Sequence, residues 1–200
     1  MPNENDAYAL PAEKAAASVA VPPPKFLVSL YELAEVLVSA VLVIAALFLF
    51  FFRFAGVVGS SMEPTLQPQD WLAVSAFSAK PETGDIVIIA QPNAFNEPLV
   101  KRVIATQGQT IDIRENRVYI DGSVLEEPYL PADTVTAAAP WYDASVALPA
   151  VVPQGYVFVM GDNRAFSSDS RRKEVGFIRN DYILGKVCLR LKPFGQFVVE

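Results

Sequence analysis

The longest apolar stretch in the sequence runs from Phe26 to Phe52, and it constrains the fold more than any other feature. Its last 17 residues, 36–52, carry no charged side chain. As a helix, the 27 residues between Lys25 and Arg53 are long enough to cross a hydrocarbon core of about 30 Å. A buried core helix would show a polar stripe, and a cleaved signal peptide would have a shorter apolar region and a small-x-small cleavage site. We therefore predict an uncleaved transmembrane helix over residues 26–53.

The segments on the two sides of this helix differ in character. Residues 1–25 are polar, include three consecutive prolines and show no periodicity, which predicts a disordered tail. Residues 54–200 carry short runs of β-branched and aromatic residues between turn formers, which predicts a β-rich domain. The runs expected to be strands are 85–90, 99–105, 110–114, 117–120, 156–160 and 183–191. The third and fourth of these are separated by Glu115-Asn116 and are expected to pair as a hairpin.

The sequence lacks histidine and has one cysteine, Cys188. These two facts exclude a Ser-His-Asp triad, a Cys-His pair, an imidazole metal ligand, an intramolecular disulfide and a cysteine zinc site. The net charge of −6 argues against a chain that coats nucleic acid. Any bond-breaking chemistry must therefore use Ser, Lys, Tyr, carboxylates or a cofactor.

The first segment that suggests chemistry is Gly59-Ser60-Ser61-Met62-Glu63-Pro64-Thr65-Leu66. A serine in such a run is usually an ordinary turn residue. Here a glycine allows close approach of the backbone to a ligand, and a proline stiffens the exit from the turn. This setting favours a hydroxyl held exposed beside free backbone N–H groups.

The second segment is Leu99-Val100-Lys101-Arg102-Val103-Ile104. On a strand, Leu99, Lys101 and Val103 share one face. Most lysines project into water, but one between two apolar neighbours is a candidate for burial. Desolvation disfavours the ammonium, lowers the lysine pKa and makes the neutral amine available as a base.

The third segment, residues 161–171, directly follows the apolar run 156–160. Its Gly, Asp, Asn and Ser residues would suit a plain turn-rich loop. Two arginines, two aspartates and three serines within eleven residues indicate instead a hydrogen-bonded, charge-paired support.

Taken together and in this order, the three segments resemble those of the bacterial type I signal peptidases, which are membrane-anchored Ser-Lys endopeptidases. Residues 61–66 are similar to the family's Ser-Met-x-Pro-Thr-Leu segment, residues 101–104 to its lysine segment, and residues 161–171 to its third box. The resemblance implies an antiparallel-sheet catalytic domain over residues 54–200. The short chain and single span look more like the Gram-positive form than the Gram-negative one.

Carried over residue by residue, the resemblance makes Ser61 the nucleophile and Lys101 the general base, with no cofactor and no metal. Ser167 would orient the Lys101 amine by a hydrogen bond. Asp169 would pair with both Arg102 and Arg171, and so fix the lysine strand against the third box.

The resemblance also implies a substrate pocket and an oxyanion hole. Met62 and Leu66 would help to line a shallow pocket for a small residue. The backbone N–H of Ser61 would bind the oxyanion, and Gly59 stands where some family members place a serine as the second donor. That second donor stays unassigned, with Ser60 or a neighbouring N–H as candidates.

The implied function is removal of signal peptides from secreted preproteins after Ala-x-Ala-like sites at the outer surface of the cytoplasmic membrane. The tail would lie in the cytoplasm and the catalytic domain outside it. The partners would be preprotein signal peptides and the lipid bilayer, and no nucleic acid. Because Ser61 is eight residues past Arg53, we expect the nucleophile to lie near the bilayer surface.

Three other interpretations compete with this one. Ser170 and Lys173 match the Ser-x-x-Lys pattern of penicillin-recognising enzymes, but the sequence has no Lys-Thr-Gly and too few residues for that fold. A non-catalytic anchored β domain that binds an envelope partner would leave the three segments as coincidence. A peptidase specialised for one client protein keeps the same chemistry and stays open.

Overall fold

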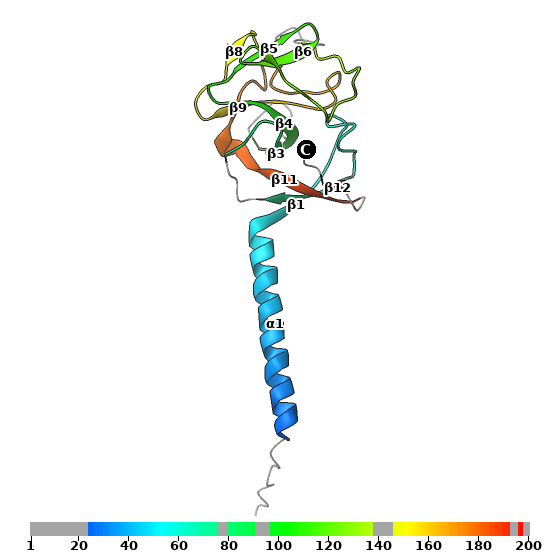
Figure 1. Cartoon of the computed structure of the whole chain (residues 1–200), viewed down its shortest axis with the longest axis vertical. Coiled ribbons are helices and arrows are strands. Elements are labelled where there is room, and N and C mark those ends of the chain that lie inside the picture. The colour runs from blue at the N-terminus through cyan, green and yellow to red at the C-terminus, as the bar shows by residue number, and fades with distance from the viewer. Residues whose placement is uncertain (1–23, 76–79, 91–96, 138–145, 193–195, 198–200) are drawn as a thin grey trace, which may run out of the picture. The chain divides into compact units, whose positions relative to one another are not determined.

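The computed structural model describes residues 24–75, 80–90, 97–137, 146–192 and 196–197. The chain divides into two compact units, residues 1–44 and residues 45–200. The predicted tail, residues 1–25, lies outside the described residues except for its last two positions. The described residues form one long helix followed by antiparallel β-structure (Figure 1), which confirms the expected fold class.

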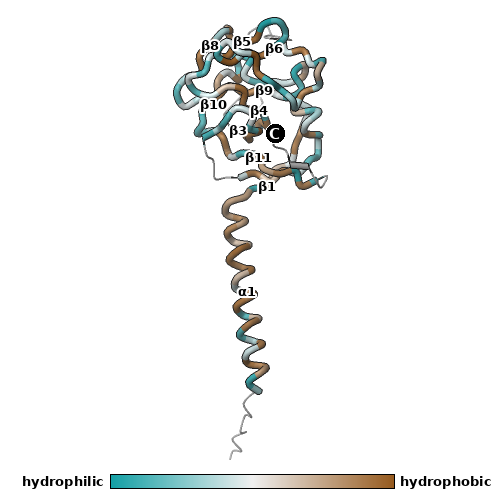
Figure 2. Tube along the Cα trace, viewed as in Figure 1, coloured by the Kyte–Doolittle hydropathy of each residue, from teal (hydrophilic) through white to brown (hydrophobic). Residues whose placement is uncertain are grey.

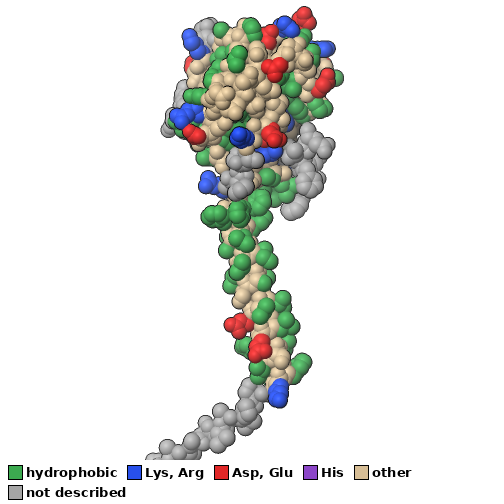
Figure 3. All heavy atoms as spheres, turned by 60° about the vertical axis from the view of Figure 1, so that its left-hand side comes forward, with side chains coloured by type: hydrophobic (Ala, Val, Ile, Leu, Met, Phe, Trp, Pro, Cys, Tyr) green, Lys and Arg blue, Asp and Glu red, His purple; other side chains and the backbone are tan. Residues whose placement is uncertain are grey.

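The helix α1 spans Lys25–Phe51, and its side chains are exposed along its whole length. Hydrophobic residues make up most of its length (Figure 2), and on the face seen in Figure 3 its acidic side chains lie only in its N-terminal part. With a mean hydropathy of 2.7 over its most apolar window, α1 is the single helix in the described part that could cross a membrane. It ends two residues before the predicted boundary at Arg53, because strand pairing takes over from Phe52 onward.

The larger sheet has the strand order β1-β2-β11-β3-β4-β9-β10, with β12 paired to β11, and every pair is antiparallel. Its strands are β1 (Phe52–Gly56), β2 (Trp71–Ser75), β3 (Ile86–Ile89), β4 (Leu99–Thr106), β9 (Tyr156–Met160), β10 (Ile178–Arg179), β11 (Ile183–Lys192) and β12 (Gln196–Phe197). A single 3-10 turn, η1 (Asn180–Tyr182), joins β10 to β11. This order places β4 in the interior of the sheet, between β3 and β9.

The smaller sheet has the order β7-β6-β5-β8. Its strands are β5 (Thr110–Arg114), β6 (Arg117–Ile120), β7 (Ser123–Val124) and β8 (Ala150–Val151). The predicted hairpin is confirmed, since β5 pairs with β6 around Glu115 and Asn116. Both turn residues have positive φ, 50° and 60°, as a two-residue turn of type I′ requires.

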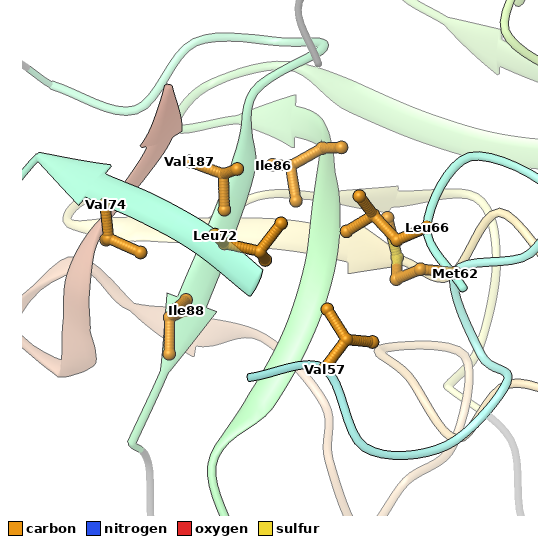
Figure 4. Packing of buried hydrophobic residues seen from close by; sticks show 8 residues of the cluster. All are labelled: Val57, Met62, Leu66, Leu72, Val74, Ile86, Ile88 and Val187. Carbon is orange, nitrogen blue, oxygen red and sulfur yellow. The ribbon is translucent and has the colours of Figure 1, made fainter. Parts of the chain in front are cut away.

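One buried cluster holds the loop between β1 and β2 against the larger sheet (Figure 4). The loop contributes Val57, Met62 and Leu66, which pack on side chains from β2, β3 and β11. The sheet side chains of the cluster are Leu72, Val74, Ile86, Ile88 and Val187. Burying one such side chain stabilises a fold by roughly 1.5–3 kcal/mol, so three of them hold the loop firmly.

Candidate active site

Ser61 lies in the loop that runs from the end of β1 to the start of β2, residues 57–70. The two ends of the loop are tied together, because the Val57 N–H donates to the Asp70 carbonyl and the Gln69 N–H donates to the Val57 carbonyl, both at 2.9 Å. Gly59 has a φ of +86°, a conformation that side chains rarely tolerate. The loop thus presents Ser61 from a closed and well-packed turn.

Lys101 lies on β4, and its amine meets the Ser61 hydroxyl. The distance from Lys101 Nζ to Ser61 Oγ is 2.7 Å, and the amine also donates to the Val100 carbonyl at 3.1 Å. Only 3% of the Lys101 surface is exposed, which confirms the burial expected from its apolar neighbours on the strand. Two residues that are 40 positions apart in sequence therefore form one nucleophile-base contact.

Burial lowers the pKa of Lys101 from 10.5 to about 8. The carboxylates of Asp169 and Asp162 oppose this shift by favouring the ammonium, and the Arg171 guanidinium reinforces it. At pH 7 a lysine of pKa 8 has about a tenth of its population as neutral amine, against less than a thousandth for an ordinary lysine. The site thus supplies a neutral amine beside a hydroxyl near neutral pH.

The third segment begins where β9 ends and packs against the Ser61 loop. The Asn163 N–H donates to the Ser61 carbonyl at 3.0 Å, and the Asn163 side chain donates to the Ser60 carbonyl at 3.1 Å. A Cβ on Gly161 would overlap both the Ser61 carbonyl oxygen and the Ser167 hydroxyl oxygen. Only glycine therefore lets these segments approach so closely.

Arg102 forms an ion pair with a different aspartate from the one expected. Its guanidinium binds Asp162 with two hydrogen bonds, at 2.9 and 2.7 Å, and so the expected pair of Arg102 with Asp169 is wrong. The register of the sheet explains the difference, because Arg102 lies opposite Met160, the last residue of β9, and Asp162 follows only two positions later.

The other expected pair, between Asp169 and Arg171, is present. The Asp169 carboxylate accepts two hydrogen bonds from the Arg171 guanidinium, both at 2.9 Å. It also accepts the Gly161 N–H at 3.1 Å, so this pair supports the backbone that faces Ser61. Both side chains are fully buried.

Ser167 is buried beside Gly161, on the side that faces the Ser61 loop. Its location agrees with a supporting role, and its hydrogen bond to the Lys101 amine stays a prediction. Ser170 and Lys173 do not form a comparable pair. The Ser170 hydroxyl is fully buried and accepts the Val159 N–H at 3.0 Å, while Lys173 is exposed.

A groove of about 460 Å³ opens beside Ser61 and Lys101. Its lining is mostly apolar and comprises residues 53–58, Ser61, Met62, Val74, Ile88, residues 97–101 and Leu184. Met62 contributes to the lining as expected. Leu66 does not, because it is completely buried in the core beneath the loop, and so its expected place in the pocket is wrong.

Two residues outside the three segments also reach this region, and the sequence pattern gave no sign of them. Glu127 forms an ion pair with Arg164 of the third segment. The Tyr129 ring lies over the Arg102 guanidinium, 3.7 Å from Arg102 Cζ to the ring centroid. No group of three or more candidate metal ligands occurs among the residues that the structure describes.

Comparison with known proteins places the chain in a family. The family model described as signal peptidase, peptidase S26, matches residues 30–192. Signal peptidase IB of Staphylococcus aureus is 35% identical over 151 residues, which cover 70% of this chain and 77% of the relative. The probable signal peptidase I-2 of Synechocystis is 32% identical over 170 residues, which cover 81% of this chain and 73% of the relative.

A crystal structure of a signal peptidase I from Enterococcus faecalis is similar over 54% of this chain and 97% of that chain, with 31% identity and a TM-score of 0.43. The sequence comparisons cover the Ser61 loop, β4 and the third segment within one matched region. They confirm the resemblance that the three segments indicated. The chain therefore belongs to the S26 family of signal peptidases and is a serine peptidase with type I signal peptidase activity.

Proposed function

We propose that this chain cleaves signal peptides from preproteins with Ser61 as the nucleophile and Lys101 as the general base. The observation that carries the proposal is the 2.7 Å contact between the amine of a buried lysine and the Ser61 hydroxyl. The chain has no histidine, so no imidazole base competes for this role. Family membership supports preproteins with signal peptides as the substrates.

Acylation follows from this contact. The neutral Lys101 amine takes the Ser61 proton as Oγ bonds to the scissile carbonyl carbon. The carbonyl becomes an oxyanion, which the Ser61 N–H stabilises. The Lys101 ammonium then gives its proton to the departing nitrogen as the C–N bond breaks.

Deacylation uses the same groups in reverse order. A water molecule loses a proton to the neutral Lys101 amine as its oxygen attacks the ester carbonyl. The Ser61 oxygen leaves and recovers a proton from Lys101. Gly59 has no hydroxyl with which to help the oxyanion, so a second donor must come from Ser60 or from a backbone N–H.

The groove supports specificity for small-x-small, Ala-x-Ala-like sites. An extended substrate would place alternate side chains into it, and most of the residues that line it are apolar. Met62 has only 1% of its surface exposed, so it closes the floor rather than offering a deep pocket. A short side chain fits such a surface, and a long one would lift the scissile carbonyl away from Ser61.

The anchor supports a single-pass membrane enzyme with a cytoplasmic tail and an extracytoplasmic catalytic domain. Ser61 follows the end of α1 at Phe51 by ten residues. Ten residues span at most about 35 Å, so the nucleophile cannot lie far from the end of the span. We assign residues 1–25 to the tail, residues 26–51 to the anchor, and residues 54–200 to the catalytic domain, which Phe52 and Arg53 join through their pairing with β2.

The direct test uses the purified full chain in detergent with a preprotein that carries an Ala-x-Ala site. Ser61→Ala should abolish cleavage, whereas Ser123→Ala, on the exposed strand β7, should cleave like the wild type. Cleavage should occur after the second alanine, as mass spectrometry of the released peptide would show. Normal cleavage by Ser61→Ala would refute the proposed nucleophile.

A further inference from the structure

Tyr129 lies outside the three segments but is in contact with the residue next to Lys101. Its ring covers one face of the Arg102 guanidinium, with 3.7 Å between Arg102 Cζ and the ring centroid. Arg102 is 98% buried, and its other contacts are the Asp162 carboxylate and the Gly84 carbonyl. The ring thus closes the remaining side of a guanidinium that binds a carboxylate with two hydrogen bonds.

The hydroxyl end of Tyr129 is also held in place. Its hydroxyl donates to Glu127 at 2.7 Å, and Glu127 pairs with the Arg164 guanidinium. Arg164 also donates to the Gly161 carbonyl at 3.0 Å. The Glu127-Pro128-Tyr129 segment therefore joins the strand that carries Lys101 to the backbone that faces Ser61.

This arrangement affects the electrostatic environment of the Lys101 amine. Asp162 and Asp169 both favour the ammonium form of Lys101. Asp169 is matched by Arg171, and Asp162 is matched by Arg102. Asp162 would act more strongly on Lys101 if Arg102 were free to turn away from it.

We propose that Tyr129 is a positioning residue of the Ser-Lys site: its ring holds Arg102 on Asp162 and so limits the charge that Asp162 presents to Lys101. The proposal rests on the proposed function only in giving Lys101 the role of base. The charged groups that act on Lys101 are Asp169, Asp162 and Arg171. Arg102 is its neighbour on β4, and Arg53 and Glu97 line the same groove.

The test is the titration of Lys101 itself, followed by ¹⁵N NMR of the Nζ signal in the full chain in detergent. The signal is assigned by its loss in Lys101→Ala. Tyr129→Leu removes the ring and should raise the Lys101 pKa, because Arg102 is then held less firmly on Asp162 and offsets less of its charge. The acid limb of kcat/KM should move upward by the same amount, while kcat at high pH stays within a few-fold of wild type.

Two variants separate the ring from other effects. Tyr129→Phe keeps the ring and loses only the hydroxyl, so it should titrate like the wild type. Tyr119→Leu removes a second tyrosine ring that stacks on an arginine, Arg114, at 4.2 Å in the β5–β6 hairpin. This matched control should leave the Lys101 titration unchanged.

A series of fluorinated phenylalanines at position 129 keeps the proposal testable if Tyr129→Leu does not fold. Fluorine withdraws electron density from the ring with little change of shape, so the Lys101 pKa should rise with each added fluorine. An unchanged pKa across this series, or an equal rise in Tyr129→Phe and Tyr129→Leu, would overturn the proposal. Because the NMR titration needs no cleavage, its outcome is independent of whether Ser61→Ala is inactive.

Discussion

The two faces of β4 give two neighbouring cationic side chains different hydrogen-bond partners. Lys101 and Arg102 are adjacent, and 3% and 2% of their surfaces are exposed. Arg102 has a carboxylate in a bidentate pair and an aromatic ring over its guanidinium. Lys101 instead meets a serine hydroxyl and a backbone carbonyl at hydrogen-bond distance.

This difference shows what allows a buried lysine to be partly neutral near pH 7, and so to act as a base. A carboxylate in direct contact would have held the amine in its charged form, as an ion partner favours the ammonium. The carboxylates near Lys101 each pair with an arginine, Asp162 with Arg102 and Asp169 with Arg171. Each arginine thus offsets the charge of its carboxylate, and the hydrogen bonds of the Lys101 amine go to a hydroxyl and a carbonyl instead.

Removing the lysine should have the largest effect. Lys101→Ala deletes the proposed base and should lower kcat/KM by at least about a thousandfold, the order expected for general base catalysis and its positioning. Combining it with Ser61→Ala should lower the rate little further, because the two residues act as one unit. Hydrolysis of a fluorogenic Ala-x-Ala peptide measures both.

Lys173→Ala provides the matched control, because this exposed lysine belongs to the rejected Ser-x-x-Lys pattern. It should retain wild-type turnover. Near-normal activity in Lys101→Ala, with loss of activity in Lys173→Ala, would contradict the assignment of the base.

Breaking the buried ion pair between Asp169 and Arg171 should lower stability. Asp169→Ala leaves Arg171 buried without its carboxylate and removes the acceptor of the Gly161 N–H. We expect a loss of about 3–5 kcal/mol in the free energy of unfolding, seen as a lower Tm in detergent.

Asp181→Ala removes the carboxylate of an exposed pair with Arg179 and should lower the Tm far less than Asp169→Ala, because solvent screens the exposed pair. Equal Tm values for Asp169→Ala and Asp181→Ala would mean that burial adds nothing to the Asp169 pair.

Several of these features were predictable from the sequence because they rest on local patterns. Leu99 and Val103 flank Lys101 at strand spacing, and that spacing predicted its burial. The hairpin around Glu115 and Asn116 followed from alternation and a two-residue turn. The strand β1 was missed because its apolar residues continue the run of the helix, so no change of composition marks where the helix ends.

Contacts between distant segments were beyond local patterns. The choice of Asp162 over Asp169 as the partner of Arg102 depends on the β4–β9 register, which the sequence does not state. Leu66 was assigned to the pocket from its motif, while the packing of the loop on the sheet puts it in the core. Tyr129 lies in a segment without periodicity or charge pattern, so nothing pointed to its contact with Arg102.

The pH dependence of cleavage tests whether the base is Lys101 or a carboxylate. The acid limb of kcat/KM should lie near the lowered Lys101 pKa of about 8, with activity rising as the amine loses its proton. An acid limb near pH 4 that persists in Lys101→Ala would point to a carboxylate base.

The same lowered pKa predicts how the free energy of unfolding changes with pH. The folded pKa of Lys101 lies below its unfolded value of 10.5, so this group costs stability below pH 10.5. The cost grows as the pH falls to about 8 and is constant below that, at about 3 kcal/mol. Lys101→Met should therefore be most stabilised relative to wild type below pH 8, with the gain vanishing above pH 10.5, as thermal unfolding across this range would show.

Ser167 should show the smallest effect, because its predicted role is to orient the amine and not to react. Ser167→Ala should lower kcat by roughly 5- to 150-fold, equivalent to about 1–3 kcal/mol, with little change in KM. Ser168→Ala, at the next position, removes a hydroxyl that binds Arg172 and should leave kcat unchanged. If Ser167 orients Lys101, the acid limb of Ser167→Ala should also move, since a hydrogen-bond partner of the amine is lost. A loss of kcat with an unmoved acid limb and a lower Tm would assign Ser167 to packing beside Gly161 instead.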